Sequence, residues 1–104
     1  MNESGIVDLD IDEVKEGLAS GSITLVDVRE PHEYAAGHIP GSISHPLSTF
    51  APEELRAMAG RIVFSCAAGV RSVRAIEFAQ AAGLDLHEHY RGGFACDPVR
   101  GARE

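Results

Sequence analysis

Residues 61–72 read RIVFSCAAGVRS, and this stretch decides the fold that we predict. Residues 61–65, with three apolar residues at their centre, are typical of a buried strand, and residues 73–82 have the spacing of a helix. Cys66 therefore lies where a strand leads into the amino end of a helix. Unpaired backbone N–H groups and the positive end of the helix dipole meet there, and both favour the thiolate over the thiol. The sequence thus predicts a reactive sulfur atom rather than an inert core cysteine.

Further strands and helices alternate along the rest of the chain. We predict strands near residues 5–10, 23–28, 43–44 and 86–90, and helices near residues 11–19, 31–36 and 52–59. Asp10 is placed to cap the first of these helices. Strands that alternate with helices imply right-handed crossovers and a parallel sheet. Ligands gather at the carboxyl ends of the strands in such a sheet, and Cys66 falls at one of these ends.

The composition limits the classes of function. The chain has 104 residues, which is enough for one domain, and its 44% hydrophobic and 24% charged residues are typical of a globular protein. A net charge of −7 argues against a basic face for nucleic acid. No apolar run approaches the roughly 20 residues of a membrane span, and the amino end lacks the pattern of a secretory signal. We therefore expect a protein that binds neither nucleic acid nor membrane. Its two cysteines do not make a disulfide-rich scaffold, so we expect it in the cytoplasm, and we predict a monomer or weak dimer.

The loop after the cysteine suits a bound anion. Small residues at Ala67, Ala68 and Gly69 let the backbone curl, with its N–H groups turned inward. Arg71 adds a fixed positive charge near the sulfur or near a substrate oxyanion. Ser72 is placed to cap the helix that follows.

Three sequence signatures make the chain resemble the rhodanese homology domain of sulfurtransferases over nearly its whole length. The first is DVREPHEY at residues 27–34 with GHIPGS at residues 37–42, the second is the cysteine loop at residues 66–72, and the third is GGF at residues 92–94. The resemblance implies one α/β domain over residues 1–104. Its expected architecture has three layers, in which a central five-stranded parallel sheet is flanked by helices. No cofactor is implied.

The resemblance also implies a reaction, in which the cysteine accepts a sulfane sulfur as a persulfide and passes it to a nucleophile. Carried onto this sequence, Cys66 is the sulfur carrier. The donor would be a small molecule such as thiosulfate, and the acceptor a thiol, cyanide or a protein. The residues implied to hold the outer sulfur and the donor are Ala67, Ala68, Gly69, Val70, Arg71 and Ser72. Because the chain is acidic and the loop rim is apolar, we expect thiosulfate to bind weakly.

Two other functions stay open at this point. In one, the domain is a sulfur-relay or protein-interaction module that carries sulfur with little turnover of thiosulfate. In the other, it is a rhodanese-like phosphatase or arsenate reductase. Those relatives resemble this domain but have five residues between the cysteine and the arginine, whereas four separate Cys66 from Arg71. The shorter loop is sized for a single sulfur atom, which argues against a tetrahedral oxyanion.

A second cysteine and two histidines are further candidates. Cys96 could resolve an oxidised or persulfidated Cys66 into a disulfide, or fill space in a tail over residues 95–104 that we expect to be irregular. His87 and His89 alternate along a strand and so project from the same face. No further ligand falls at zinc-site spacing, so we expect a polar strand face near the sheet edge and no metal.

The charged residues of the first signature are assigned structural roles. Asp27 and Arg29 end a strand and are placed to pair with loop groups, and Glu33 is placed to pair with Arg29. His38 is expected to satisfy a turn. Arg74, which follows the cysteine loop, is expected on the surface.

Overall fold

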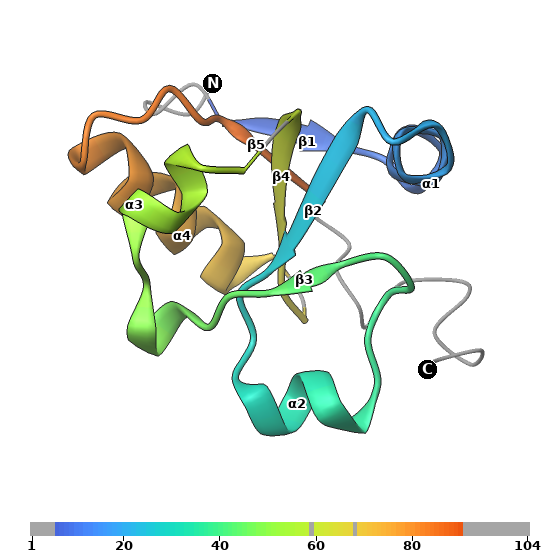
Figure 1. The fold of residues 1–104 in the computed structure, drawn as a ribbon, viewed down its shortest axis with the longest axis horizontal. Helices are drawn as coiled ribbons and strands as arrows, with labels where there is room; N and C mark the ends of the chain where they lie inside the picture. Colours follow the sequence, from blue (N-terminus) through green and yellow to red (C-terminus); the bar gives the residue numbers. More distant parts are fainter. Residues whose placement is uncertain (1–5, 59, 68, 91–104) are drawn as a thin grey trace.

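The computed structural model describes residues 6–58, 60–67 and 69–90, which form a five-stranded parallel sheet with helices packed on it (Figure 1). The strands are β1 (Val7–Leu9), β2 (Ile23–Asp27), β3 (Ile43–Ser44), β4 (Arg61–Ser65) and β5 (Glu88–Tyr90). The helices are α1 (Ile11–Ser20), α2 (Pro31–Ala36), α3 (Pro52–Arg56) and α4 (Val70–Ala81), with a 3-10 turn at Leu47–Thr49. The strand order is β1-β5-β4-β2-β3, so β4 is central.

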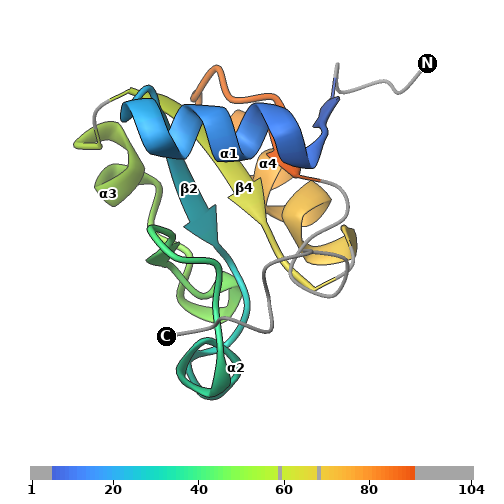
Figure 2. The same cartoon turned by 90° about the vertical axis from the view of Figure 1, so that its right-hand side faces the viewer.

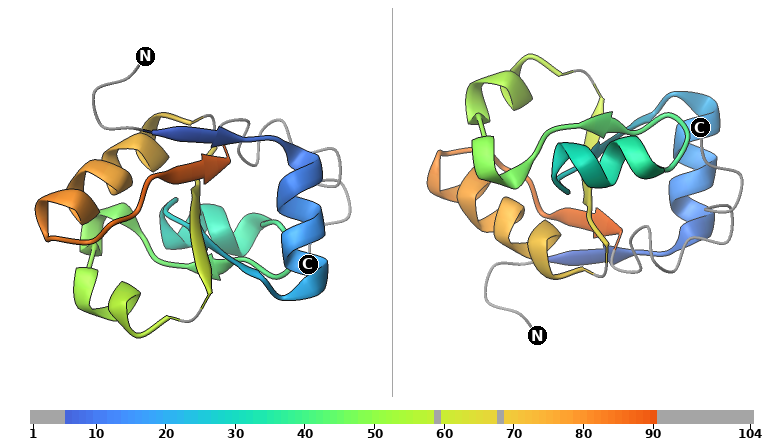
Figure 3. Two further views of the ribbon diagram at one scale, coloured as in Figure 1. Left: turned by 90° about the horizontal axis from the view of Figure 1, so that it is seen from above. Right: turned by 90° about the horizontal axis from the view of Figure 1, so that it is seen from below.

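The sheet separates two apolar clusters, which gives the three predicted layers. On one face α1 packs through Val14 against Leu25 of β2 and Val63 of β4. On the other face α3 and α4 cover the side chains that alternate with these, among them Phe64 and Cys66. Figure 3 shows α1 on one side of the sheet and α3 and α4 on the other, and Figure 2 shows α1 lying across β2 and β4. The α/β fold expected from the sequence is confirmed.

Helix α1 illustrates how local signals set the element boundaries. The Asp10 carboxylate accepts the backbone N–H of Glu13, whose own carboxylate accepts that of Asp10, so the predicted cap is present. The helix ends at Gly21, which adopts a left-handed conformation with φ of 78°. Within the helix, a Cβ at Gly17 would lie 2.3 Å from the Cδ1 atom of Ile23, so this position admits no side chain while α1 stays this close to β2.

Two helix boundaries differ from the sequence prediction. Helix α4 begins at Val70, three residues before the predicted start, because Gly69 turns the chain with φ of 91° directly into the helix. The assignment of Ser72 as the helix cap is therefore wrong, since this residue lies inside the first turn. Helix α3 ends at Arg56 instead of near residue 59, because its last turn closes with i to i−3 hydrogen bonds.

Some sequence predictions fall on residues that are not described. These are the GGF signature at residues 92–94, Cys96, and the irregular tail over residues 95–104. Within the described ranges, no helix combines the length and the apolar character that crossing a bilayer requires.

Candidate active site

Cys66 lies immediately beyond the carboxyl end of the central strand β4, and its sulfur is enclosed by the loop that follows. The residue is only 1% exposed. Its Sγ atom accepts the backbone N–H groups of Gly69 at 3.0 Å and Ser72 at 3.4 Å. N–H donors at the start of a helix favour a negatively charged sulfur over a neutral thiol. Cys66 is thus a buried sulfur whose two backbone donors would stabilise a negative charge on it.

The other residues predicted for this site differ in their exposure to solvent. Val70 is 73% exposed at the rim, Arg71 is half-buried, and Ser72 is fully buried. Ala67 is half-buried in the loop, and Ala68 lies outside the described residues. Arg74 is exposed, as expected.

Arg71 is held by a carboxylate from the other side of the site. Its two terminal nitrogens donate to the carboxylate oxygens of Glu33 on α2 at 2.7 and 3.0 Å. The hydrogen bonds from Arg71 lower the pKa of Glu33 from 4.5 to about 2. The pKa of Arg71 is raised, first by its hydrogen bonds to Glu33 and then by the charges of Glu33 and Cys66. The pair therefore stabilises the fold fully above pH 4.5, and this contribution is lost as the pH falls through about 2.

The expected pairing of Glu33 with Arg29 is wrong, because the guanidinium of Arg29 binds Asp27 and Gly37 instead. Its guanidinium donates to both carboxylate oxygens of Asp27, at 2.8 to 3.1 Å, and to the carbonyl oxygen of Gly37 at 2.7 Å. Both side chains are buried. The ion pair holds the Arg29 side chain, and the hydrogen bond from Arg29 to Gly37 ties the end of β2 to the end of α2, the helix that carries Glu33. His38 stacks on Tyr34 and contacts its carbonyl oxygen through Nδ1, which agrees with a role in the turn.

The two histidines do not form the polar strand face that the sequence predicts. His87 precedes β5 and pairs with the exposed carboxylate of Asp85. His89 is buried, because β5 lies inside the sheet between β1 and β4 instead of at its edge. His89 contacts Ser72 through Nδ1 at 2.7 Å and Asp8 through Nε2 at 2.6 Å. The contacts of His89 with Ser72 and Asp8 were not predicted from the sequence. In the described part of the chain, no group of three or more side chains is arranged to hold a metal ion.

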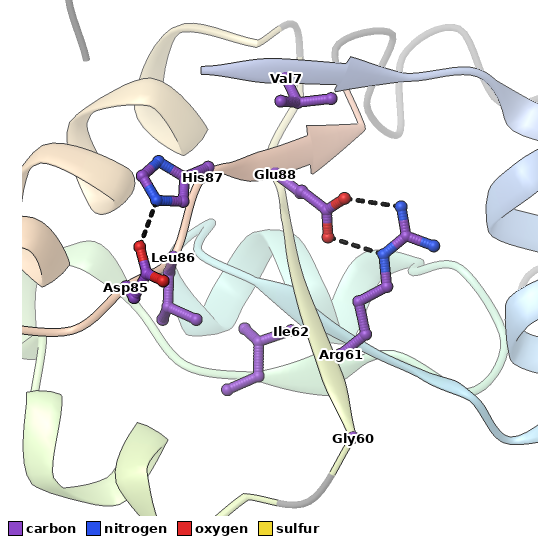
Figure 4. Close-up of a pocket in the computed structure, with 8 residues that line it drawn as sticks. All are labelled: Val7, Gly60, Arg61, Ile62, Asp85, Leu86, His87 and Glu88. Atoms are coloured by element: carbon purple, nitrogen blue, oxygen red, sulfur yellow. Dashed lines mark hydrogen bonds and ion pairs between the residues drawn. The ribbon is translucent and has the colours of Figure 1, made fainter. Parts of the chain in front are cut away.

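A separate hollow of about 560 Å³ lies at the opposite end of the strands from Cys66 (Figure 4). It is formed at the amino ends of β4 and β5, where Arg61 and Glu88 make a bidentate ion pair at 2.7 and 2.6 Å. Its lining residues are Val7, Gly60, Arg61, Ile62, Asp85, Leu86, His87 and Glu88. None of them belongs to the cysteine loop, so this hollow is not part of the cysteine site.

These features define a structural class: parallel α/β domains that enclose a cysteine sulfur with backbone N–H groups at the carboxyl end of the central strand. Within this class, the chain belongs to the rhodanese-like sulfurtransferase family, and the model of the rhodanese-like domain matches residues 10–95. The resemblance found in the sequence signatures is thereby confirmed.

Individual relatives place the chain among proteins named as sulfurtransferases. It is 37% identical over 97 residues to the mouse thiosulfate sulfurtransferase/rhodanese-like domain-containing protein 3, covering 79% of this chain but only 62% of that protein. It is 28% identical over 106 residues to the human thiosulfate:glutathione sulfurtransferase, covering 88% and 92% of the two chains. The solved structure of a human single-domain sulfurtransferase superposes with a TM-score of 0.69 at 30% identity, covering 86% of this chain and 92% of the other.

Proposed function

We propose that this domain is an enzyme that transfers a sulfane sulfur through a persulfide on Cys66. The observation that carries the proposal is the enclosed Sγ atom, which accepts two backbone N–H groups at the carboxyl end of the central strand. Arg71 is a partly exposed cation five residues along the chain, and the charge of Cys66 contributes to its raised pKa. The names of the mouse and human relatives support thiosulfate as a donor, and the human one supports glutathione as an acceptor.

The proposed reaction has two displacements. The Cys66 thiolate attacks the sulfane sulfur of thiosulfate, so a new S–S bond forms while the bond to the sulfonate group breaks, and sulfite leaves with the electron pair. A thiolate or cyanide then attacks the outer sulfur and releases the Cys66 thiolate. The first step leaves the outer persulfide sulfur at the loop, and the second returns a negative charge to the Cys66 sulfur, where the loop N–H groups stabilise it without rearrangement. Two steps through a covalent intermediate predict ping-pong kinetics.

Intact mass measurement tests this proposal directly. After incubation with thiosulfate, the protein is expected to gain the mass of one sulfur atom, located on the Cys66 peptide, with release of sulfite. Cyanide or glutathione should then remove the added mass and restore the starting protein. A stable gain with no removal by either acceptor would favour the sulfur-relay module. Hydrolysis of an aryl phosphate or reduction of arsenate, without any gain of sulfur, would favour the phosphatase or reductase reading.

The ion pair at the mouth of the site predicts how the donor is recognised. In Glu33→Gln, Arg71 keeps a hydrogen-bonding neighbour but is no longer neutralised by a carboxylate. We expect the KM for thiosulfate to fall by about fivefold with little change in kcat, since a partly exposed ion pair is worth on the order of 1 kcal/mol. The effect should shrink at raised salt because the charges are partly screened. Steady-state kinetics at two salt concentrations measures both.

A matched control separates this local effect from a change in net charge. Glu53→Gln removes the same charge from an exposed ion pair with Arg56 on α3. We expect its KM for thiosulfate to equal that of the wild type. A KM that is unchanged or higher in Glu33→Gln would contradict the prediction and would indicate that Glu33 is needed to hold Arg71 in position.

A further inference from the structure

Cys66 is the first member of a chain of four side chains that crosses the sheet from the active site. Its thiol contacts the hydroxyl of Ser72 on α4 at 3.7 Å. The same hydroxyl lies 2.7 Å from Nδ1 of His89 on β5, and Nε2 of that ring lies 2.6 Å from a carboxylate oxygen of Asp8 on β1. The four residues therefore come from the loop after β4, from a helix and from two neighbouring strands.

The chemistry of these groups fixes the direction of the three hydrogen bonds that join the four side chains. An ionised carboxylate only accepts hydrogen bonds, so Nε2 of His89 carries the proton that faces Asp8. In the neutral ring Nδ1 is then the acceptor, and Ser72 must donate its hydroxyl hydrogen to it. The oxygen of Ser72 is left to accept the thiol hydrogen of Cys66. Each hydrogen thus points away from the sulfur and towards the carboxylate.

The four side chains differ in exposure from one end of the series to the other. Cys66, Ser72 and His89 are 1%, 0% and 2% exposed, whereas the Asp8 side chain is 46% exposed. A thiolate left alone in so buried a place is costly, whereas a thiolate with a nearby imidazolium forms a neutral pair.

We propose that Ser72 and His89 form a proton relay that deprotonates Cys66, with Asp8 holding the histidine in the required tautomer. The S–H bond of Cys66 breaks and its proton binds the oxygen of Ser72. The original hydroxyl proton of Ser72 passes to Nδ1 of His89. The products are a thiolate, a neutral serine hydroxyl that now donates to the sulfur, and an imidazolium that faces the Asp8 carboxylate. The relay rests on the proposed function for its purpose, because that function requires a thiolate.

The charged groups around the relay are compatible with this transfer. On β1 the carboxylate of Asp8 stabilises the imidazolium, and on β4 the residue paired with His89 is the uncharged Phe64. On α4 the charge of Cys66 acts on Arg71 and helps to raise its pKa, and this cation is itself paired with Glu33. Arg71 stabilises the thiolate once it forms, but its guanidinium is already protonated and cannot accept the thiol proton. His89 is therefore the base of the site within the described residues.

The pH profile of Cys66 alkylation tests the relay without any sulfur donor. Iodoacetamide labelling is followed on the Cys66 peptide in the wild type and in His89→Asn, whose side-chain amide can still accept from Ser72 but cannot take a proton. We expect the rate at neutral pH to fall about tenfold and the midpoint of the profile to rise by about one pH unit or more. The rate at the alkaline plateau should be unchanged, because the Cys66 thiol is fully ionised there in both proteins. A purely structural role would leave the midpoint in place.

Further variants complete the test. Ser72→Ala should move the midpoint as His89→Asn does, and the double variant should move it no further, because the two residues act as one unit. Asp8→Asn changes only the exposed end of the relay and should raise the midpoint of the alkylation profile by a smaller amount. Its matched control is Asp85→Asn, which alters the exposed pair with His87 and should leave the profile unchanged.

The outcomes separate the relay from the proposed function. Coincident profiles for the wild type, His89→Asn and Asp8→Asn would overturn the relay, even if the wild type takes up sulfur normally. A shifted profile in a protein that takes up no sulfur would support the relay and contradict the sulfurtransferase proposal.

Discussion

Replacement of Cys66 with serine is expected to abolish sulfur transfer, with a loss of at least about 10³-fold in turnover of thiosulfate. A serine oxygen cannot form the S–S bond of a persulfide, so the variant should gain no mass from the donor. The fold should survive, because a hydroxyl is slightly smaller than a thiol and can accept the same N–H groups of Gly69 and Ser72. Turnover with cyanide and intact mass measure the loss, and urea unfolding checks the stability.

The other cysteine provides the comparison for this variant. Cys96→Ser should keep its sulfur uptake if Cys66 is the carrier, whereas loss of uptake would place Cys96 in the reaction. A disulfide formed with peroxide in the wild type but absent from Cys96→Ser would assign it a resolving role. Residual transfer by Cys66→Ser near the wild-type rate would contradict the proposed mechanism.

Arg29→Met is expected to lower the free energy of unfolding by about 3 to 5 kcal/mol at neutral pH. The substitution leaves the buried carboxylate of Asp27 without its cation, and it removes a donor from the carbonyl oxygen of Gly37. An uncompensated buried charge costs far more than a lost surface contact. Equilibrium urea unfolding followed by circular dichroism gives the difference.

The exposed pair between Arg56 and Glu53 is the matched control for this second prediction. Arg56→Met removes the same functional group from a side chain that is 45% exposed, beside a carboxylate that is 83% exposed. It should cost no more than about 1 kcal/mol. Equal costs for the two variants would show that the buried pair gives no special support to α2.

The sequence predicted the central part of the fold because its signals are local. Residues 61–65 have an apolar centre and end at a loop of small residues, and the strand has those bounds in the structure. The cap at Asp10 and the stop at Gly21 likewise depend only on neighbouring residues. The start of α4 was missed because the turn at Gly69 is tighter than the spacing of apolar residues suggests.

The partners of charged side chains were predicted less well, since they depend on how distant segments meet. Glu33 is closer in sequence to Arg29 than to Arg71, yet the ion pair between Arg29 and Asp27 leaves Arg71 as its partner. His89 looked like a surface residue because alternation along a strand does not reveal the order of strands in the sheet. Only that order places β5 beside β1 and brings Asp8 to His89.

The pairing of the first strand with the last has a consequence for the newly made chain. Asp8 and His89 are 81 positions apart, so almost the whole domain must leave the ribosome before they can meet. Closing so long a loop costs chain entropy before the contact contributes any stability. A partly synthesised domain therefore has Cys66 without its base, and the sulfur gains its full reactivity only when folding is complete.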